Sequence, residues 1–334
     1  MKFRQFAFFI ILILLGVLVL KNAGKMGELL DLLKGMNLFV LVLILPVRFM
    51  YYWFNTRYYK HFFSLYGHTL STKELFPAVV SMNFVNTVIP TGGISGATFF
   101  ARTMEPKVDQ KISLLAQSFW YLATFCSFVL LLVASFLVLF FSNAIAQASF
   151  RLILILISGV LFLAFCVFAI SLNELVMRRA LVILTTPVNW VLKLFRRAPI
   201  GETHIKQFVH SYHTLIELFR KHPKKAWRPL ADAIGCVGVE IVSIMIVFLA
   251  IGQLVNPGVI GAGYVFAMIF SVLSVFTSGV GAYEATMVAV FVALGQSFEV
   301  SLSVTAVYRL IALWLFIPFG LIYYKRQTLD DKPE

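Results

Sequence analysis

The chain has 334 residues, 60% of them hydrophobic, and a mean hydropathy of +0.90. This composition excludes an ordinary soluble domain and requires several membrane-spanning segments. The net charge of +13 is typical of a membrane protein whose cytoplasmic loops contact anionic headgroups. Nucleic-acid binding is the other interpretation of a basic chain, but no polar stretch is long enough to form a soluble module, so we expect none.

Apolar segments, taken in chain order, predict an all-α polytopic membrane protein with six full spans. They cover residues 6–20, 38–54, 112–141, 152–172, 229–251 and 300–324. The first follows Lys2 and Arg4 and resembles a signal peptide, but no small-x-small cleavage motif follows it. We therefore expect an uncleaved span there.

Two further apolar segments carry the chemistry of broken helices, which makes eight hydrophobic segments in all. In the first, residues 74–102, an arm of about 22 Å passes the bilayer midplane before Pro90, Gly92 and Gly93 stop it. The second breaks within residues 277–284. Irregular backbone at membrane depth must line protein or a water-filled cavity, so we predict two re-entrant hairpins. Two short full spans remain the alternative for the second.

Charge along the chain predicts its topology. Lys and Arg are absent from residues 253–299 and concentrate in the N-terminus, in 55–73, 102–111 and 174–228, and after 324. We expect the protein in the cell (inner or cytoplasmic) membrane. The positive-inside rule places both of its termini on the cytoplasmic side. The first hairpin then enters from the cytoplasm and the second from outside, as in inverted-repeat transporters. We expect one membrane domain, 1–334, in which 174–228 is a basic cytoplasmic loop with an amphipathic helix at 204–221.

Cysteines and histidines give no sign of a metal or cofactor. Cys126, Cys166 and Cys236 lie in apolar runs and none belongs to a Cys-x-x-Cys motif. The histidines of the 204–221 segment fit an interfacial helix better than a metal cluster. We predict no disulfide, metal or cofactor.

Glycines mark the candidate site. Gly92-Gly93 and Gly279-x-Gly281 each precede a helix that begins at membrane depth, where backbone N–H groups are unpaired and carry partial positive charge. Two such helix starts facing one cavity suit a phosphate group. Glycines that merely let helices pack are the alternative. If the phosphate site exists, Gly93→Val is expected to block backbone approach and slow transport without unfolding the protein.

Polar and charged side chains gather around these breaks. Asn83, Asn86 and Thr87 share a helix face before Pro90 and either bind a headgroup or satisfy freed backbone groups. Charges within apolar segments usually mark function, although Glu and Arg can pair only to hold helices together. They are Arg48, Asp232, Glu240, Glu284 and Arg309. We predict that Glu284 and Arg309 pair, and that Arg309 exchanges Glu284 for a lipid phosphate.

Two motifs resemble the lysylphosphatidylglycerol synthase transmembrane family, a flippase-like membrane domain. They are Asn86-x-x-x-Pro90-x-Gly92-Gly93 with a following Arg102, and Gly279-x-Gly281-x-x-Glu284 followed by Tyr308-Arg309 and Pro318. The second departs from the commoner Pro-Gly-Gly form. Fuller-length members carry a cytosolic aminoacyl-tRNA-dependent transferase that makes lysyl-phosphatidylglycerol, which the membrane part is held to move. This chain stops at Glu334, which predicts a stand-alone form without the transferase.

The resemblance and the residues together favour a translocase for an anionic or aminoacylated phospholipid, or for a polyprenyl-phosphate-linked lipid. The alternatives are the membrane part or partner of a phosphatidylglycerol lysyltransferase, and a membrane adaptor that docks an enzyme through 174–228. We expect membrane lipids as partners, with a lipid-modifying enzyme at the cytoplasmic face as a further candidate. Glu240 and Glu284 are candidates for acid–base chemistry, but no catalytic motif supports them, so we predict no catalytic residue. The candidate substrate-binding residues are Asn83, Asn86, Thr87, Pro90, Gly92, Gly93, Arg102, Glu240, Gly279, Gly281, Glu284 and Arg309.

Overall fold

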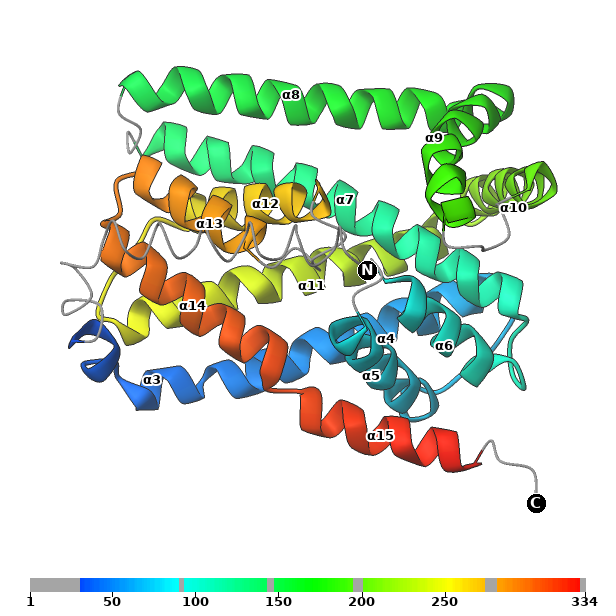
Figure 1. Ribbon diagram of the computed structural model, residues 1–334, viewed down its shortest axis with the longest axis horizontal. Helices are drawn as coiled ribbons and strands as arrows, with labels where there is room; N and C mark the ends of the chain where they lie inside the picture. Colours follow the sequence, from blue (N-terminus) through cyan, green and yellow to red (C-terminus); the bar gives the residue numbers. More distant parts are fainter. Residues whose placement is uncertain (1–30, 90–92, 143–146, 195–200, 274–280, 331–334) are drawn as a thin grey trace.

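The computed structural model describes residues 31–89, 93–142, 147–194, 201–273 and 281–330, and these parts are helical (Figure 1). Within these residues, four helical stretches are long and apolar enough to cross a membrane: Leu38–Leu65, Gln110–Phe141, Pro223–Ala250 and Phe298–Gln327. A fifth candidate is a bent pair, Ile157–Leu172 and Glu174–Ile183. The predicted all-α polytopic membrane fold is confirmed, and the expected span at 6–20 lies outside the described residues.

Helices α4 (Ile44–Leu65) and α11 (Pro223–Ala250) form the centre of the bundle. Proline at the first position of α11 suits a helix start, because the missing N–H has no partner there. Much of α11 is buried, whereas α7 (Gln110–Phe141) and α8 (Gln147–Leu172) lie farther out (Figure 1). The short α3 (Leu38–Val42) leads into α4.

Helix α4 continues past Phe54, where we predicted the span to end. Asn55, Thr56 and Tyr59 are buried in this extension. Asn55 accepts a hydrogen bond from Asn83, and Tyr59 bonds to Gln117. The predicted boundary was wrong because these polar side chains find partners inside the bundle, so polarity did not signal a loop.

The first hairpin consists of α5 (Thr72–Val88) and α6 (Ile94–Met104). Ser71 and Glu74 form a capping box that starts α5, and α6 begins directly after Gly93. At the base of the hairpin, the Lys107 Nζ lies 3.0 Å from a Glu74 carboxylate oxygen, so the outer ends of the two arms meet. The chain thus enters and returns on the same side, as predicted.

The second hairpin consists of α12 (Pro257–Leu273) and α13 (Ala282–Ala293), which pack against each other. Helix α13 is about 18 Å long, too short to cross a core of about 30 Å. The connections from α11 to α12 and from α13 to α14 (Phe298–Trp314) lie at the same end of the bundle (Figure 1). The pair therefore leaves and rejoins the bundle at one end, and the short α13 favours a re-entrant hairpin.

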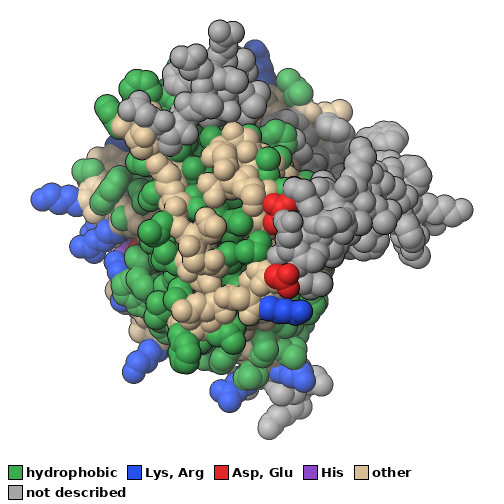
Figure 2. Space-filling view, turned by 90° about the vertical axis from the view of Figure 1, so that its left-hand side faces the viewer, with side chains coloured by type: hydrophobic (Ala, Val, Ile, Leu, Met, Phe, Trp, Pro, Cys, Tyr) green, Lys and Arg blue, Asp and Glu red, His purple; other side chains and the backbone are tan. Residues whose placement is uncertain are grey.

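The two hairpins enter from opposite ends of the bundle. The first adjoins the start of α7, whereas Asn256, just before α12, bonds to Ser142 at the end of α7 with an N–O distance of 2.8 Å. This opposed arrangement fits the predicted inverted-repeat-like fold. Helix α15 (Ile317–Asp330) follows α14 and packs on α5. The end face at the second hairpin is largely hydrophobic or uncharged, and Lys and Arg project mainly at its margin (Figure 2).

Helices α9 (Glu174–Leu194) and α10 (Glu202–Lys221) lie together at one end of the bundle (Figure 1). A bend of 118° separates the apolar part of α8 from α9. Met177, Ile205 and Val209 form a small core of their own between α9 and α10. The amphipathic helix expected at 204–221 is present as α10.

Candidate functional site

At the tip of the first hairpin, neutral polar groups are already satisfied. The Asn86 side-chain oxygen accepts the Gly96 N–H at 3.0 Å, which ties the end of α5 to the start of α6. Asn83 donates to Asn55 at 3.0 Å and to the Val79 carbonyl at 2.8 Å. Thr87 donates to the Asn83 carbonyl. These contacts correspond to the structural alternative, in which the side chains satisfy other protein groups.

Gly93 sits at the turn of the first hairpin with φ of 90°, a conformation that favours glycine. A Cβ at this position would collide with the Tyr121 hydroxyl. The expectation that Gly93→Val leaves the fold intact was therefore wrong, since valine would be strained in this backbone whatever binds nearby. Pro90 and Gly92 lie outside the described residues.

At the tip of the second hairpin, the Glu284 carboxylate closes the turn. One oxygen accepts the Gly281 N–H at 2.6 Å, and the other accepts from the Arg309 Nε at 2.6 Å. The Arg309 guanidinium also lies over the Tyr283 ring, 4.3 Å from its centroid. The predicted contact between Glu284 and Arg309 is present, and it is half-buried, with side chains 22% and 16% exposed. Gly279 lies outside the described residues.

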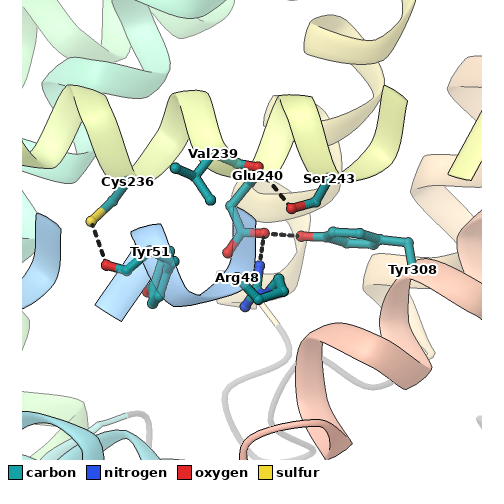
Figure 3. A network of polar contacts seen from close by, with 7 residues as sticks. All are labelled: Arg48, Tyr51, Cys236, Val239, Glu240, Ser243 and Tyr308. Atoms are coloured by element: carbon teal, nitrogen blue, oxygen red, sulfur yellow. Dashed lines mark hydrogen bonds and ion pairs between the residues drawn. The ribbon is translucent and has the colours of Figure 1, made fainter. Parts of the chain in front are cut away.

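Behind this tip lies a buried charged network (Figure 3). The Glu240 carboxylate accepts from Arg48 and, at 2.8 Å, from the Tyr308 hydroxyl. Arg48 is 3% exposed and Glu240 is 7% exposed. Tyr308 precedes Arg309 on α14, so neighbouring residues of one helix contact Glu240 and Glu284. Among the described residues, Arg48 Nε has no hydrogen-bond partner, which leaves one buried cationic donor for an anion.

A third charged cluster joins α4 to α11 farther along the pair. The Asp232 carboxylate is buried. One of its oxygens lies 3.2 Å from Arg57 Nε, and the other lies 2.5 Å from His61 Nδ1. Arg57 also lies over the Trp53 ring, 4.4 Å from its centroid. We flagged Asp232 from the sequence but missed Arg57 and His61, because both lie beyond residue 54, where we predicted the span to end. Their spacing on a continued α4 helix is the signal that identifies them.

Arg102 is not brought to the hairpin tip. It is exposed and lies in the last turn of α6, about 13 Å along the helix from Gly93. A substrate contact shared by Arg102 and the glycines would need a ligand that spans most of α6.

Backbone N–H groups at both helix starts are less open than predicted. Asn86 occupies the Gly96 N–H, and Glu284 occupies the Gly281 N–H. A phosphate can reach these particular donors only by displacing a side-chain oxygen. The displaced group is neutral at the first tip and anionic at the second, so the two tips differ in the charge that a ligand must replace.

A model of the lysylphosphatidylglycerol synthase transmembrane region matches residues 5–320. The chain belongs to this family. Neither the curated proteins nor the solved structures gave a match. Family membership indicates that the chain is a membrane protein associated with lipid metabolism. The apolar spans and the charges buried among them agree with this.

Proposed function

We propose that this protein translocates a phosphate-bearing phospholipid, anionic or aminoacylated, between the two leaflets, with the second hairpin tip as its headgroup site. A polyprenyl-phosphate-linked lipid presents the same phosphate chemistry. The observation that carries the proposal is the Glu284 carboxylate, which holds the Gly281 N–H and Arg309 at once. These are the two kinds of donor that a phosphate binds most strongly.

Binding would proceed by exchange of one anion for another. A lipid phosphate replaces the Glu284 carboxylate on Arg309, and the carboxylate re-forms its bonds when the lipid leaves. Because oxygen acceptors are present in both states, neither leaves Arg309 as an unpaired charge at membrane depth. The Glu240 network supports α14 from behind, and its Arg48 Nε offers a further donor to an anion that passes inward.

Alternating access fits the opposed hairpins. A rocking of one hairpin against the α4–α11 pair would open the site to one leaflet and close it to the other. The sequence holds no Gly-x-x-x-x-Gly-Lys-Ser/Thr motif, so we propose downhill or ion-coupled transport.

The orientation follows from charge. The end of the bundle that carries the basic α6–α7 connection and the C-terminal helix would face the cytoplasm. We therefore propose a cytoplasmic-membrane location with both termini cytoplasmic. The nearly uncharged connections beside the second hairpin would face outward.

A scrambling assay tests the function. Purified protein is reconstituted into vesicles with fluorescent phosphatidylglycerol or phosphatidylcholine, and a membrane-impermeant quencher reports the rate of exchange between leaflets. We expect Arg309→Gln to slow the exchange of phosphatidylglycerol between leaflets about tenfold or more, because hydrogen bonds to charged groups contribute about 1.5–3 kcal/mol. Lys111→Gln, an exposed change in the first turn of α7, serves as the matched control. Exchange no faster than in protein-free vesicles would overturn the proposal.

The family description favours a second candidate: a membrane partner of an enzyme that makes lysylphosphatidylglycerol. In that role α9 and α10 would dock the enzyme at the cytoplasmic face. Copurification with a lipid-modifying transferase, together with no scrambling by the isolated chain, would favour this candidate over the translocase.

A further inference from the structure

A cavity of about 320 Å³ lies between α9 and α10, and no residue of either hairpin lines it. Its lining comes from both helices: Glu174, Leu175, Arg178, Lys206, Val209 and His210. The cavity is at the lower end of the range for small-molecule sites, so it has room for a headgroup and not for a whole lipid.

The sequence builds this cavity from two charged faces and an apolar floor. Glu174 and Arg178 are four residues apart on α9, and Lys206 and His210 are four residues apart on α10, so each pair shares one side of its helix. Val209 is 1% exposed and belongs to the small core between the helices. Arg178 is positioned by Glu202, which accepts from Nη2 at 3.2 Å.

The cavity also lies where apolar surface meets charge. The bend after α8 turns the chain away from the direction of a membrane span. Leu172, Leu175 and Val176 are exposed at this bend, next to the charged lining. Exposed aliphatic side chains beside basic ones are typical of a membrane–water interface.

From this combination we propose that the α9–α10 cavity binds the phosphate group of an anionic phospholipid. Lys206 and Arg178 would contact the phosphate, and the acyl chains would lie over Leu172 and Leu175. Basic pockets beside membrane spans bind anionic headgroups in the same way, with basic side chains next to an apolar surface. Glu174 opposes the phosphate charge and keeps the binding reversible. The proposal is independent of transport at the hairpin tip.

A site-resolved labelling experiment separates this cavity from the hairpins. The full-length protein in detergent is titrated with short-chain phosphatidylglycerol that carries a photoactivatable group, and the labelled peptides are mapped by mass spectrometry. We expect labelling at α9 and α10. Lys206→Gln should weaken it about fivefold, because one basic side chain contributes about 1 kcal/mol near an anionic headgroup.

Glu174→Gln provides a change in the opposite direction, since it removes the repelling carboxylate and should tighten the labelling. Lys225→Gln, an exposed change in the same basic region but outside the cavity, is the matched control. Each of these side chains is exposed, so the variants should fold, and thermal unfolding checks this.

Inorganic phosphate distinguishes the two sources of the ligand. Failure of millimolar phosphate to compete supports a lipid headgroup. Competition that shows the same dependence on Lys206 and Glu174 supports the phosphate site and assigns it to free phosphate. Labelling that neither Lys206→Gln nor Glu174→Gln changes would overturn the site.

Discussion

The two hairpins close their tips with different chemistry. In the first, the neutral Asn86 amide accepts a backbone N–H on the returning helix, whereas in the second the Glu284 carboxylate accepts both a backbone N–H and a guanidinium. A neutral closure is insensitive to the charge of its surroundings. A charged closure can be exchanged for another anion. The same backbone device therefore has a neutral closure at the first tip and a charged closure at the second, and the exchange that we propose concerns the second.

The largest effect is expected behind the second tip, at Glu240. Glu240→Gln removes the charge that balances Arg48 in a site almost closed to water. Removing one partner of a buried pair costs about 3–5 kcal/mol, because the remaining charge is left uncompensated. Chemical unfolding in micelles measures this loss, with the exposed Glu105→Gln as control. A Glu240→Gln protein as stable as the control would show that the stability of the bundle behind the second tip does not depend on this buried charge.

Asp232 sharpens this result within the same helix pair. Its partner Arg57 is partly exposed and can turn to water. Asp232→Asn should therefore destabilise the protein less than Glu240→Gln does. The two variants, measured side by side, report how far burial rather than charge sets the loss.

The next effect concerns the charged closure at the second tip. Glu284→Gln, Arg309→Gln and the double variant form a thermodynamic cycle. We expect a coupling of about 1–2 kcal/mol, below the value for a dry pair because both side chains are partly exposed. Thermal unfolding and scrambling are read on the same samples. Additive losses of stability would contradict the pairing, and full transport by the double variant would make the pair structural only.

At the first tip the expected effect is smaller. Asn86→Ala leaves the Gly96 N–H without its acceptor, at a cost of about 1 kcal/mol. Asn86→Asp keeps an acceptor oxygen and should restore part of the loss. Unfolding midpoints of the two variants measure this difference. A loss of stability at Asn86 as large as that at Glu240 would remove the distinction between the two hairpins.

The sequence predicted the hairpins because a turn that needs a positive φ favours glycine, so the glycines mark it. Gly93 and Gly281 both adopt a positive φ. It also predicted the pairing of Glu284 with Arg309, since their segments are adjacent in the chain. The Arg48–Glu240 pair could not be derived in the same way, because 192 residues separate its members and only tertiary packing joins them. Residues 55–65 were left outside the predicted span because their polar side chains gave no sign of buried partners.

The smallest expected effect lies at the base of the first hairpin. There the Ser71 side chain and backbone, followed by Lys107, lower the pKa of the Glu74 carboxyl from 4.5 to about 2. A lowered pKa in the folded state means that this carboxylate stabilises the protein above pH 4.5, and that the contribution disappears as the pH falls towards 2. Glu74→Gln should therefore lower the unfolding midpoint at pH 6.5 and matter progressively less below pH 4.5. Lys107→Met removes only the ion pair, so its smaller effect should decrease with added salt, whereas the bonds to Ser71 persist. A difference between wild type and Glu74→Gln that stays constant with pH would show that the base, like the tip, is held without charge.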